Sequence, residues 1–167
     1  MPDFKEERDL ARNTNFLFVF DDNRENTYAV QNTSTPDISL GETLIGSQPK
    51  DLYLPSNKLE TSPIVIQMLV SEDYREWIDM YKWMLQLKNT IVNPYPDLVR
   101  TCELISLDSQ HQPSTRFIYT DCFPINISSV QYSTQDEASV ISFDITLRYN
   151  LFHIETNDGE LITDTYR

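Results

Sequence analysis

Two histidines and two cysteines are the side chains best suited to chemistry in this chain, and their spacing assembles no site. Cys102 and Cys122 could act as nucleophiles or metal ligands, and His111 and His153 could add imidazole ligands. Zinc and other transition-metal sites need such ligands grouped in characteristic short spacings. The surroundings of the two histidines match none of those patterns. The sequence therefore predicts no metal site.

The scarcity of glycine and the spacing of the acidic residues argue against a phosphate-binding loop and a calcium-binding loop. A loop that cradles phosphate needs several glycines for close backbone approach, and the chain has only Gly41, Gly46 and Gly159. The acidic run of Asp21, Asp22 and Glu25 lacks the alternating ligand pattern of a calcium loop, so it predicts a turn. We expect no catalytic residue and no cofactor, and the protein is not expected to be an enzyme.

The length and net charge of the chain limit the number of domains and the kinds of partner that it can have. A chain of 167 residues suits one domain, which typically buries roughly 70% of its unfolded surface. The 13 basic and 26 acidic residues give a net charge of −13, which would repel phosphate and argues against nucleic-acid binding. Such a charge serves solubility, or it forms a surface past which nucleic acid moves without sticking.

Targeting signals and membrane segments are not evident in the sequence. The first dozen residues alternate in charge, and no apolar run reaches the roughly 18 residues that a membrane helix needs. We expect a soluble, intracellular protein with no membrane partner, whose two cysteines are unpaired.

The most informative local feature is a strand that turns directly into a helix. Residues 62–70 alternate so that Ile64, Ile66 and Met68 share one face while the other face is partly apolar, which predicts a central strand. Ser71 is expected to cap a helix over residues 74–88. That helix carries Trp77, Tyr81 and Trp83 on an apolar arc broad enough for a second buried surface, although a well-covered helix within one domain explains it equally.

The rest of the chain is predicted to be β. Strands at 15–20 and 27–33 are expected to form a hairpin, a short strand is expected at 38–45, and residues 55–57 are expected to turn. A second hairpin is predicted from 98–107 and 115–121, and residues 123–124 should interrupt the chain before a weak strand at 125–132. The final predicted strand, 141–149, alternates most clearly, and its polar face is either solvent-exposed or the wall of an aqueous channel. That face comprises Ser142, Asp144, Thr146 and Arg148.

These elements indicate a mainly β (α+β) fold. We expect an antiparallel β-sandwich or small barrel with one flanking amphipathic helix. The expected boundaries are an N-terminal arm at 1–14, a β domain at 15–154 and a C-terminal tail at 155–167 that is an arm or disordered.

Several segments resemble, in order and spacing, the tail tube protein family of contractile-tailed bacteriophages. The strand–helix join carries the strongest likeness, and the segments before and after it agree over nearly the whole chain. They are residues 12–20, 30–36, 54–59, 64–83, 122–132 and 141–149.

The resemblance implies a homohexameric ring whose sheets join into one barrel around a DNA channel, with strand edges paired between subunits. The helix start at 72–77 is more similar to minor members at the end of a tube, and the chain has no room for the extra domains of a tube initiator. The implied role is therefore a tail completion or terminator protein, with a major tail tube protein or a baseplate-side initiator as alternatives.

The same resemblance implies the partners and the residues involved. The partners would be tail tube, tail sheath and neck or baseplate proteins in a virion tail assembled in the host cytoplasm, with DNA passing through without specific binding. The candidate lumen residues are the polar set of the final strand. The candidate packing or inter-subunit residues are Trp77, Tyr81, Trp83, Ile64, Ile66 and Met68.

A function of a different class remains open from sequence. A monomeric β-barrel could bind a small ligand, with Trp77, Tyr81 and Trp83 lining the pocket.

Overall fold

Ten strands and one helix make up the described part of the chain. The computed structural model describes residues 11–20, 30–46, 50–90, 98–135 and 139–163. In chain order the elements are β1 (Phe16–Phe20), β2 (Val30–Thr33), β3 (Ile38–Ile45), β4 (Leu52–Thr61), β5 (Ile64–Leu69), α1 (Arg75–Asn89), β6 (Arg100–Leu107), β7 (Pro113–Ile127), β8 (Ser142–Arg148), β9 (Leu151–Glu155) and β10 (Leu161–Thr163).

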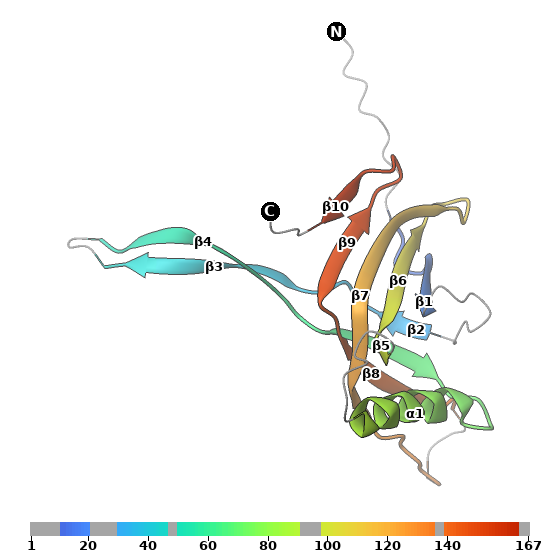
Figure 1. Cartoon of the computed structure of the whole chain (residues 1–167). Helices are drawn as coiled ribbons and strands as arrows, with labels where there is room; N and C mark the ends of the chain where they lie inside the picture. The colour runs from blue at the N-terminus through green and yellow to red at the C-terminus, as the bar shows by residue number, and fades with distance from the viewer. Residues whose placement is uncertain (1–10, 21–29, 47–49, 91–97, 136–138, 164–167) are drawn as a thin grey trace.

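Two antiparallel sheets share the long strand β7 (Figure 1). The first half of β7 pairs with β6 on one side and β9 on the other, which gives the order β1-β6-β7-β9-β10. The second half pairs with β8, which gives the order β2-β5-β8-β7. Between the halves, Asp121 has a left-handed backbone with φ 57°, a conformation that aspartate tolerates better than most residues. Because β7 bends there, one strand serves both sheets.

The hydrophobic core lies between the inner faces of the two sheets and α1. The first sheet contributes Phe18, Phe20 and Tyr119, and the second contributes alternate residues of β5 and β8. In β8 the exposure alternates strictly, with Phe143, Ile145 and Leu147 buried and the residues between them half-buried. The mainly β antiparallel fold with one flanking helix is therefore confirmed.

The strand–helix join is present, but its cap differs from the expectation. Helix α1 begins at Arg75, its N-cap position is Tyr74 with φ 57°, and no side chain caps it. Ser71 lies before the helix, where its carbonyl oxygen accepts the Tyr74 N–H at 3.0 Å. The prediction that Ser71 is the N-cap is wrong, because a tight turn separates it from the first helical residue.

β3 and β4 form an arm that pairs with no other strand (Figure 1). Their register shifts between Leu40 and Glu42, which face Leu59 and Pro55. At this bulge a Cβ added to Gly41 would lie 3.1 Å from the Cβ of Ser56, so glycine allows the close approach. The predicted turn at residues 55–57 is wrong, because β4 continues through these residues as the wider side of the bulge.

Strand pairing corrects three further expectations. β1 pairs with β6 and β2 with β5, so the predicted hairpin between them is wrong. β7 runs unbroken through Phe123 and Pro124, because that half is an edge of the second sheet, where proline is tolerated. The strand at 142–148 is not the last, since β9 and β10 follow it, and β10 in the predicted tail pairs with β9.

In the described residues, no helix is long and apolar enough to cross a membrane.

Candidate functional site

One face of the sheet β2-β5-β8-β7 is polar and turned away from the core. Asp144 on β8 lies opposite Gln67 on β5, and the Gln67 side-chain amide donates to Ser142 Oγ at 3.3 Å. Ser142, Asp144 and Thr146 are half-buried and Arg148 is exposed, all on the side opposite the buried residues of β8. The four candidate lumen residues therefore share one face, as the sequence alternation predicted.

Neighbouring strands extend this polar face without adding charge. Asn32 on β2 is opposite Gln67, and Asn126 on β7 is opposite Thr146. A shallow hollow on the same face is lined by Asn32, Thr33, Ser34, Val65, Gln67 and Asp144. The paired residues of the four strands thus offer one carboxylate, at Asp144, and one guanidinium, at Arg148. Although the whole chain is acidic, this face is almost neutral and rich in amides and hydroxyls.

The aromatic residues of α1 divide into a buried one and a surface pair. Trp83 is 1% exposed and its indole N–H donates to the Leu98 carbonyl oxygen at 2.7 Å. The Arg100 guanidinium carbon lies 4.4 Å from the Trp83 ring centroid, a cation–π arrangement. Trp83 thus fills the core, and this placement disfavours the ligand pocket that it was considered to line.

Trp77 and Tyr81 form a stack nearer the surface. Their ring centroids lie 5.5 Å apart with planes inclined by 26°. Tyr81 is 46% exposed, whereas the Trp77 indole nitrogen is buried without a hydrogen-bond partner. The remaining candidate packing residues, Ile64, Ile66 and Met68, all lie in the core.

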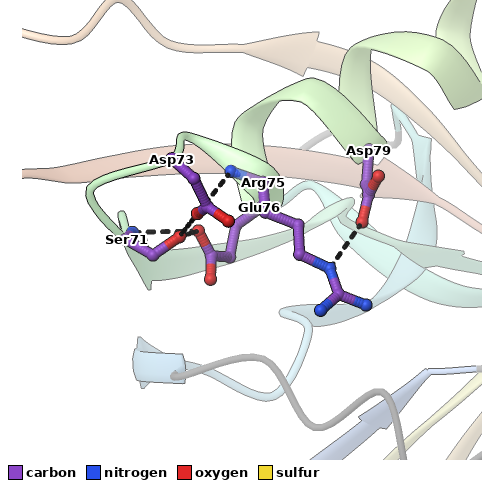
Figure 2. A network of polar contacts seen from close by, with 5 residues as sticks. All are labelled: Ser71, Asp73, Arg75, Glu76 and Asp79. Atoms are coloured by element: carbon purple, nitrogen blue, oxygen red, sulfur yellow. Dashed lines mark hydrogen bonds and ion pairs between the residues drawn. The ribbon is translucent and has the colours of Figure 1, made fainter.

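The turn before α1 carries a network of carboxylates around Ser71 (Figure 2). Glu76 Oε2 accepts the Ser71 N–H at 2.9 Å and the Ser71 hydroxyl at 2.7 Å, and Asp73 also contacts this hydroxyl. The hydrogen bond from Ser71 lowers the pKa of Asp73. Burial raises the pKa of Glu76, but the two bonds from Ser71 outweigh it and the net shift is downward. The network fastens the strand–helix turn.

Other side chains that could take part in chemistry, two thiols and a phenol hydroxyl, are buried. Cys102 and Cys122 are buried, and no disulfide joins them. Burial raises the pKa of the Tyr119 hydroxyl, with smaller contributions from Tyr149 and the two thiols. Within the described ranges, no group of three or more His, Cys, Asp or Glu side chains could hold a metal ion. The acidic turn at Asp21, Asp22 and Glu25 lies outside the described residues.

The arm is the surface that sequence reasoning missed. Its strands carry eight large hydrophobic residues that are more than a third exposed: Ile38, Leu40, Leu44, Ile45, Leu52, Tyr53, Leu54 and Leu59. The available signal was two apolar runs on either side of the polar residues 46–50. The pattern was obscured because Pro55, Ser56 and Asn57 are also residues typical of turns.

Comparison with known proteins relates the chain to contractile tails. No protein-family profile matches it. The tail tube terminator protein of Enterobacteria phage T4 is 26% identical over 115 residues, which are 66% of this chain and 65% of that relative. The match thus spans just under two thirds of that protein's length.

The fold extends the relation over most of the chain. The sheath/tube terminator of an extracellular contractile injection system in its extended state superposes with a TM-score of 0.71, covering 90% of this chain and 99% of that one at 12% identity. The tube terminating cap of the anti-feeding prophage gives a TM-score of 0.66, covering 89% of this chain and 93% of the other at 13% identity. The chain thus shares the fold of these tube terminators over most of its length, and its sequence is similar to that of a tail tube terminator protein.

Two of the described surfaces lie outside the packed core of the subunit. The polar face of the β2-β5-β8-β7 sheet lies outside the core, and the β3–β4 arm pairs only with itself.

Proposed function

We propose that this protein is the tail tube terminator of a contractile tail, a structural and non-enzymatic virion component. It forms a homohexameric ring at the end of the inner tube and leaves a channel for DNA. The single observation that carries the ring is the sheet β2-β5-β8-β7, which has one face in the core, one polar face and open edges at β2 and at the second half of β7.

The strand directions favour closure of this sheet around an axis. β2, β5, β8 and β7 are successively antiparallel, so β2 runs opposite to the second half of β7. In a ring related by rotation, β2 of one subunit therefore meets β7 of the next in antiparallel orientation, and the alternation continues without a break. Such closure removes the exposed edges that otherwise promote aggregation.

The polar face would then line the channel. Ser142, Asp144, Thr146 and Arg148 present hydroxyls and nearly balanced charge, while the whole chain carries a net charge of −13. A face of this kind gives DNA no strong attraction, since binding to phosphate depends on clustered basic residues. We expect DNA to pass without specific binding.

The 26% identity to a terminator protein favours the end of the tube over a place along it, where a major tube protein would lie, or at the baseplate, where an initiator would lie. Tail tube, sheath and neck proteins are the expected partners, and the chain would assemble in the host cytoplasm. The domain of residues 15–154 would form the ring wall.

Cross-linking of the strand edges tests the ring. Gln31→Cys on β2 and Asn126→Cys on β7 place exposed thiols on the two edges, and the native cysteines are buried. Oxidation of the double variant should give a ladder of linked subunits ending at a hexamer, whereas each single variant should give none. Failure of the double variant to form the ladder, together with a monomeric mass for the wild type and no rings in micrographs, would refute the proposal.

The position in the tail needs a separate measurement. Purified protein added to tube assembled from a tail tube protein should appear in electron micrographs at tube ends. Copies along the tube wall would identify a major tube protein instead.

A further inference from the structure

The first sheet carries apolar side chains on its outer face, the face turned away from the core. Val19 on β1 and Ile105 on β6 are 6% and 3% exposed, yet neither belongs to the core cluster. Phe18, Phe20 and Leu104, their neighbours in the chain, do belong to it. Because successive residues of a strand point to opposite faces, Val19 and Ile105 lie on the outer face.

Two further apolar side chains extend this surface. Leu17 lies opposite Ile105, and Val19, Glu103 and Ile118 form one row across β1, β6 and β7. Leu17 and Ile118 are half-buried, and neither packs against the core. We call Leu17, Val19, Ile105 and Ile118 the outer patch. A solvated sheet face would be polar, so we expect a segment of protein to cover this patch.

The chain enters β1 from the side on which β6 lies. Asn15 N–H donates to the Arg12 carbonyl oxygen at 3.2 Å, and the Asn15 carbonyl oxygen accepts the Leu107 N–H at 3.0 Å. Both backbone groups of an extended residue point to the same side of its strand, so Arg12 lies on the β6 side. The Asn15 side-chain amide also donates to the Asp108 carbonyl oxygen at 3.2 Å. The chain before β1 is therefore held against the turn between β6 and β7.

Two polar hollows continue from this point toward the outer face. The lining of the first includes Ala11 and Ser114, and the lining of the second includes Ser114 and Arg116. Arg116 lies opposite Ile105 of the outer patch. The two hollows thus form a path from the first described residue of the chain to the edge of the patch.

The segment that precedes Ala11 is long enough to follow this path. Residues 1–10 lie outside the described ranges, and ten extended residues reach at most about 35 Å. β1, β6 and β7 are neighbouring strands, so the patch is only about 10 Å wide across them. Phe4 and Leu10 are large apolar side chains within the segment that suit an apolar patch.

Charge does not oppose this contact. Residues 1–10 contain two basic and four acidic side chains. Each hollow also has one guanidinium and one carboxylate in its lining, Arg12 with Asp108 in the first and Arg116 with Glu155 in the second. A segment and a surface that both carry mixed charges meet without the repulsion of two surfaces of one sign.

We propose that residues 1–10 turn back across the end of the first sheet and cover its outer patch within the same copy of the chain. In this position the segment occupies the outer face of the sheet and withholds it from other proteins. The inference does not depend on the proposed ring, because every residue that carries it belongs to one copy.

Trypsin tests whether the segment is docked, because it cleaves after Lys5 and Arg8. Ile118→Thr removes apolar surface from the patch and keeps a β-branched side chain. Cleavage after both residues should become at least about threefold faster in this variant, since it follows the fraction of undocked segment. Mass spectrometry of the released peptides measures the rate, and the melting temperature shows that the variant is folded.

A matched control makes the same substitution elsewhere on β7. Ile125 is 44% exposed in the half of the strand that belongs to the second sheet, so Ile125→Thr should be cleaved at the wild-type rate. An unchanged rate in Ile118→Thr, or the same acceleration in Ile125→Thr, would overturn the proposal.

Cross-linking identifies the occupant of the patch without altering the patch. Phe4→Cys can carry a benzophenone maleimide, because both native cysteines are buried. In a mixture of isotope-labelled and unlabelled protein, illumination should link the label to a peptide of β1, β6 or β7 from the same copy. The same label on Val140→Cys, an exposed position before β8, should leave these peptides unlinked.

Three results of this experiment would overturn the proposal. They are links to a second copy, links only to an added tail tube protein, and the absence of any link to the first sheet. Equal linking by the Val140 control would do the same, since the label would then reach the sheet from any position.

Discussion

Trp83 Nε1 lies 2.7 Å from the carbonyl oxygen of Leu98 and ties the buried side of α1 to the segment that enters β6. Trp83 is almost completely buried, and Arg100, the first residue of β6, lies over its ring. The bond therefore couples the helix to the first sheet. Its loss should lower the free energy of unfolding.

Trp83→Phe should lower the free energy of unfolding by about 1–2 kcal/mol, because the Leu98 carbonyl loses its donor and some packing is lost. Urea titration of the monomer measures this change. Tyr81→Phe on the exposed side of the same helix is the control and should stay within about 0.5 kcal/mol of wild type. Equal effects of the two substitutions would contradict the buried hydrogen bond.

Ser71→Ala should raise the pKa values of Asp73 and Glu76 toward their ordinary values of 3.8 and 4.5. Because both are lowered in the folded protein, the stabilisation from this network is complete above the ordinary pKa values and is lost as the pH falls through the lowered ones. The wild type should therefore exceed the variant in stability near neutral pH and lose this advantage in acid.

Carboxyl NMR titration of both proteins measures the two pKa values directly. Ser39→Ala on the arm is the control and should leave them unchanged. Wild-type values for Asp73 and Glu76 in the Ser71 variant would show that the serine does not set them.

Asp144→Lys should slow DNA ejection by at least about twofold in low salt without preventing ring formation, since a cation on each subunit attracts phosphate. Asp144→Asn, which removes charge without adding any, should have a smaller effect. Ejection from phage carrying each variant is followed by release of a DNA dye, and the difference should shrink as salt rises. An unchanged rate for Asp144→Lys would remove this face from the channel.

Gly41→Val should disturb the arm and leave the body intact. The added Cβ would lie 3.1 Å from the Cβ of Ser56, and the branches of valine add further crowding, so the bulge must shift. Gly46→Val is matched, because a Cβ there meets nothing within 4 Å. Limited proteolysis should cleave β3 and β4 faster in the Gly41 variant alone, at an unchanged melting temperature. Equal cleavage in both variants would show that the close approach does not shape the arm.

The local spacing of apolar residues was sufficient to predict β8 and α1. The alternation of Phe143, Ile145 and Leu147 predicted a strand with one buried face, and the spacing of Trp77, Tyr81 and Trp83 predicted the helix to within a residue at each end. Both patterns depend on which side of an element is buried, and this information is carried by neighbouring residues.

Only the tertiary structure decided which strands pair and which apolar residues remain uncovered. β1 and β2 are close in sequence yet belong to different sheets, because their partners β6 and β5 lie far along the chain. Leu44 and Tyr53 have the composition of a core pair, and their exposure follows from where the arm projects. The sequence by itself determined α1, β8 with its buried and polar faces, the acidic charge and the family resemblance. The pairing of the two sheets and the projection of the arm follow from contacts between distant segments, which no local pattern encodes.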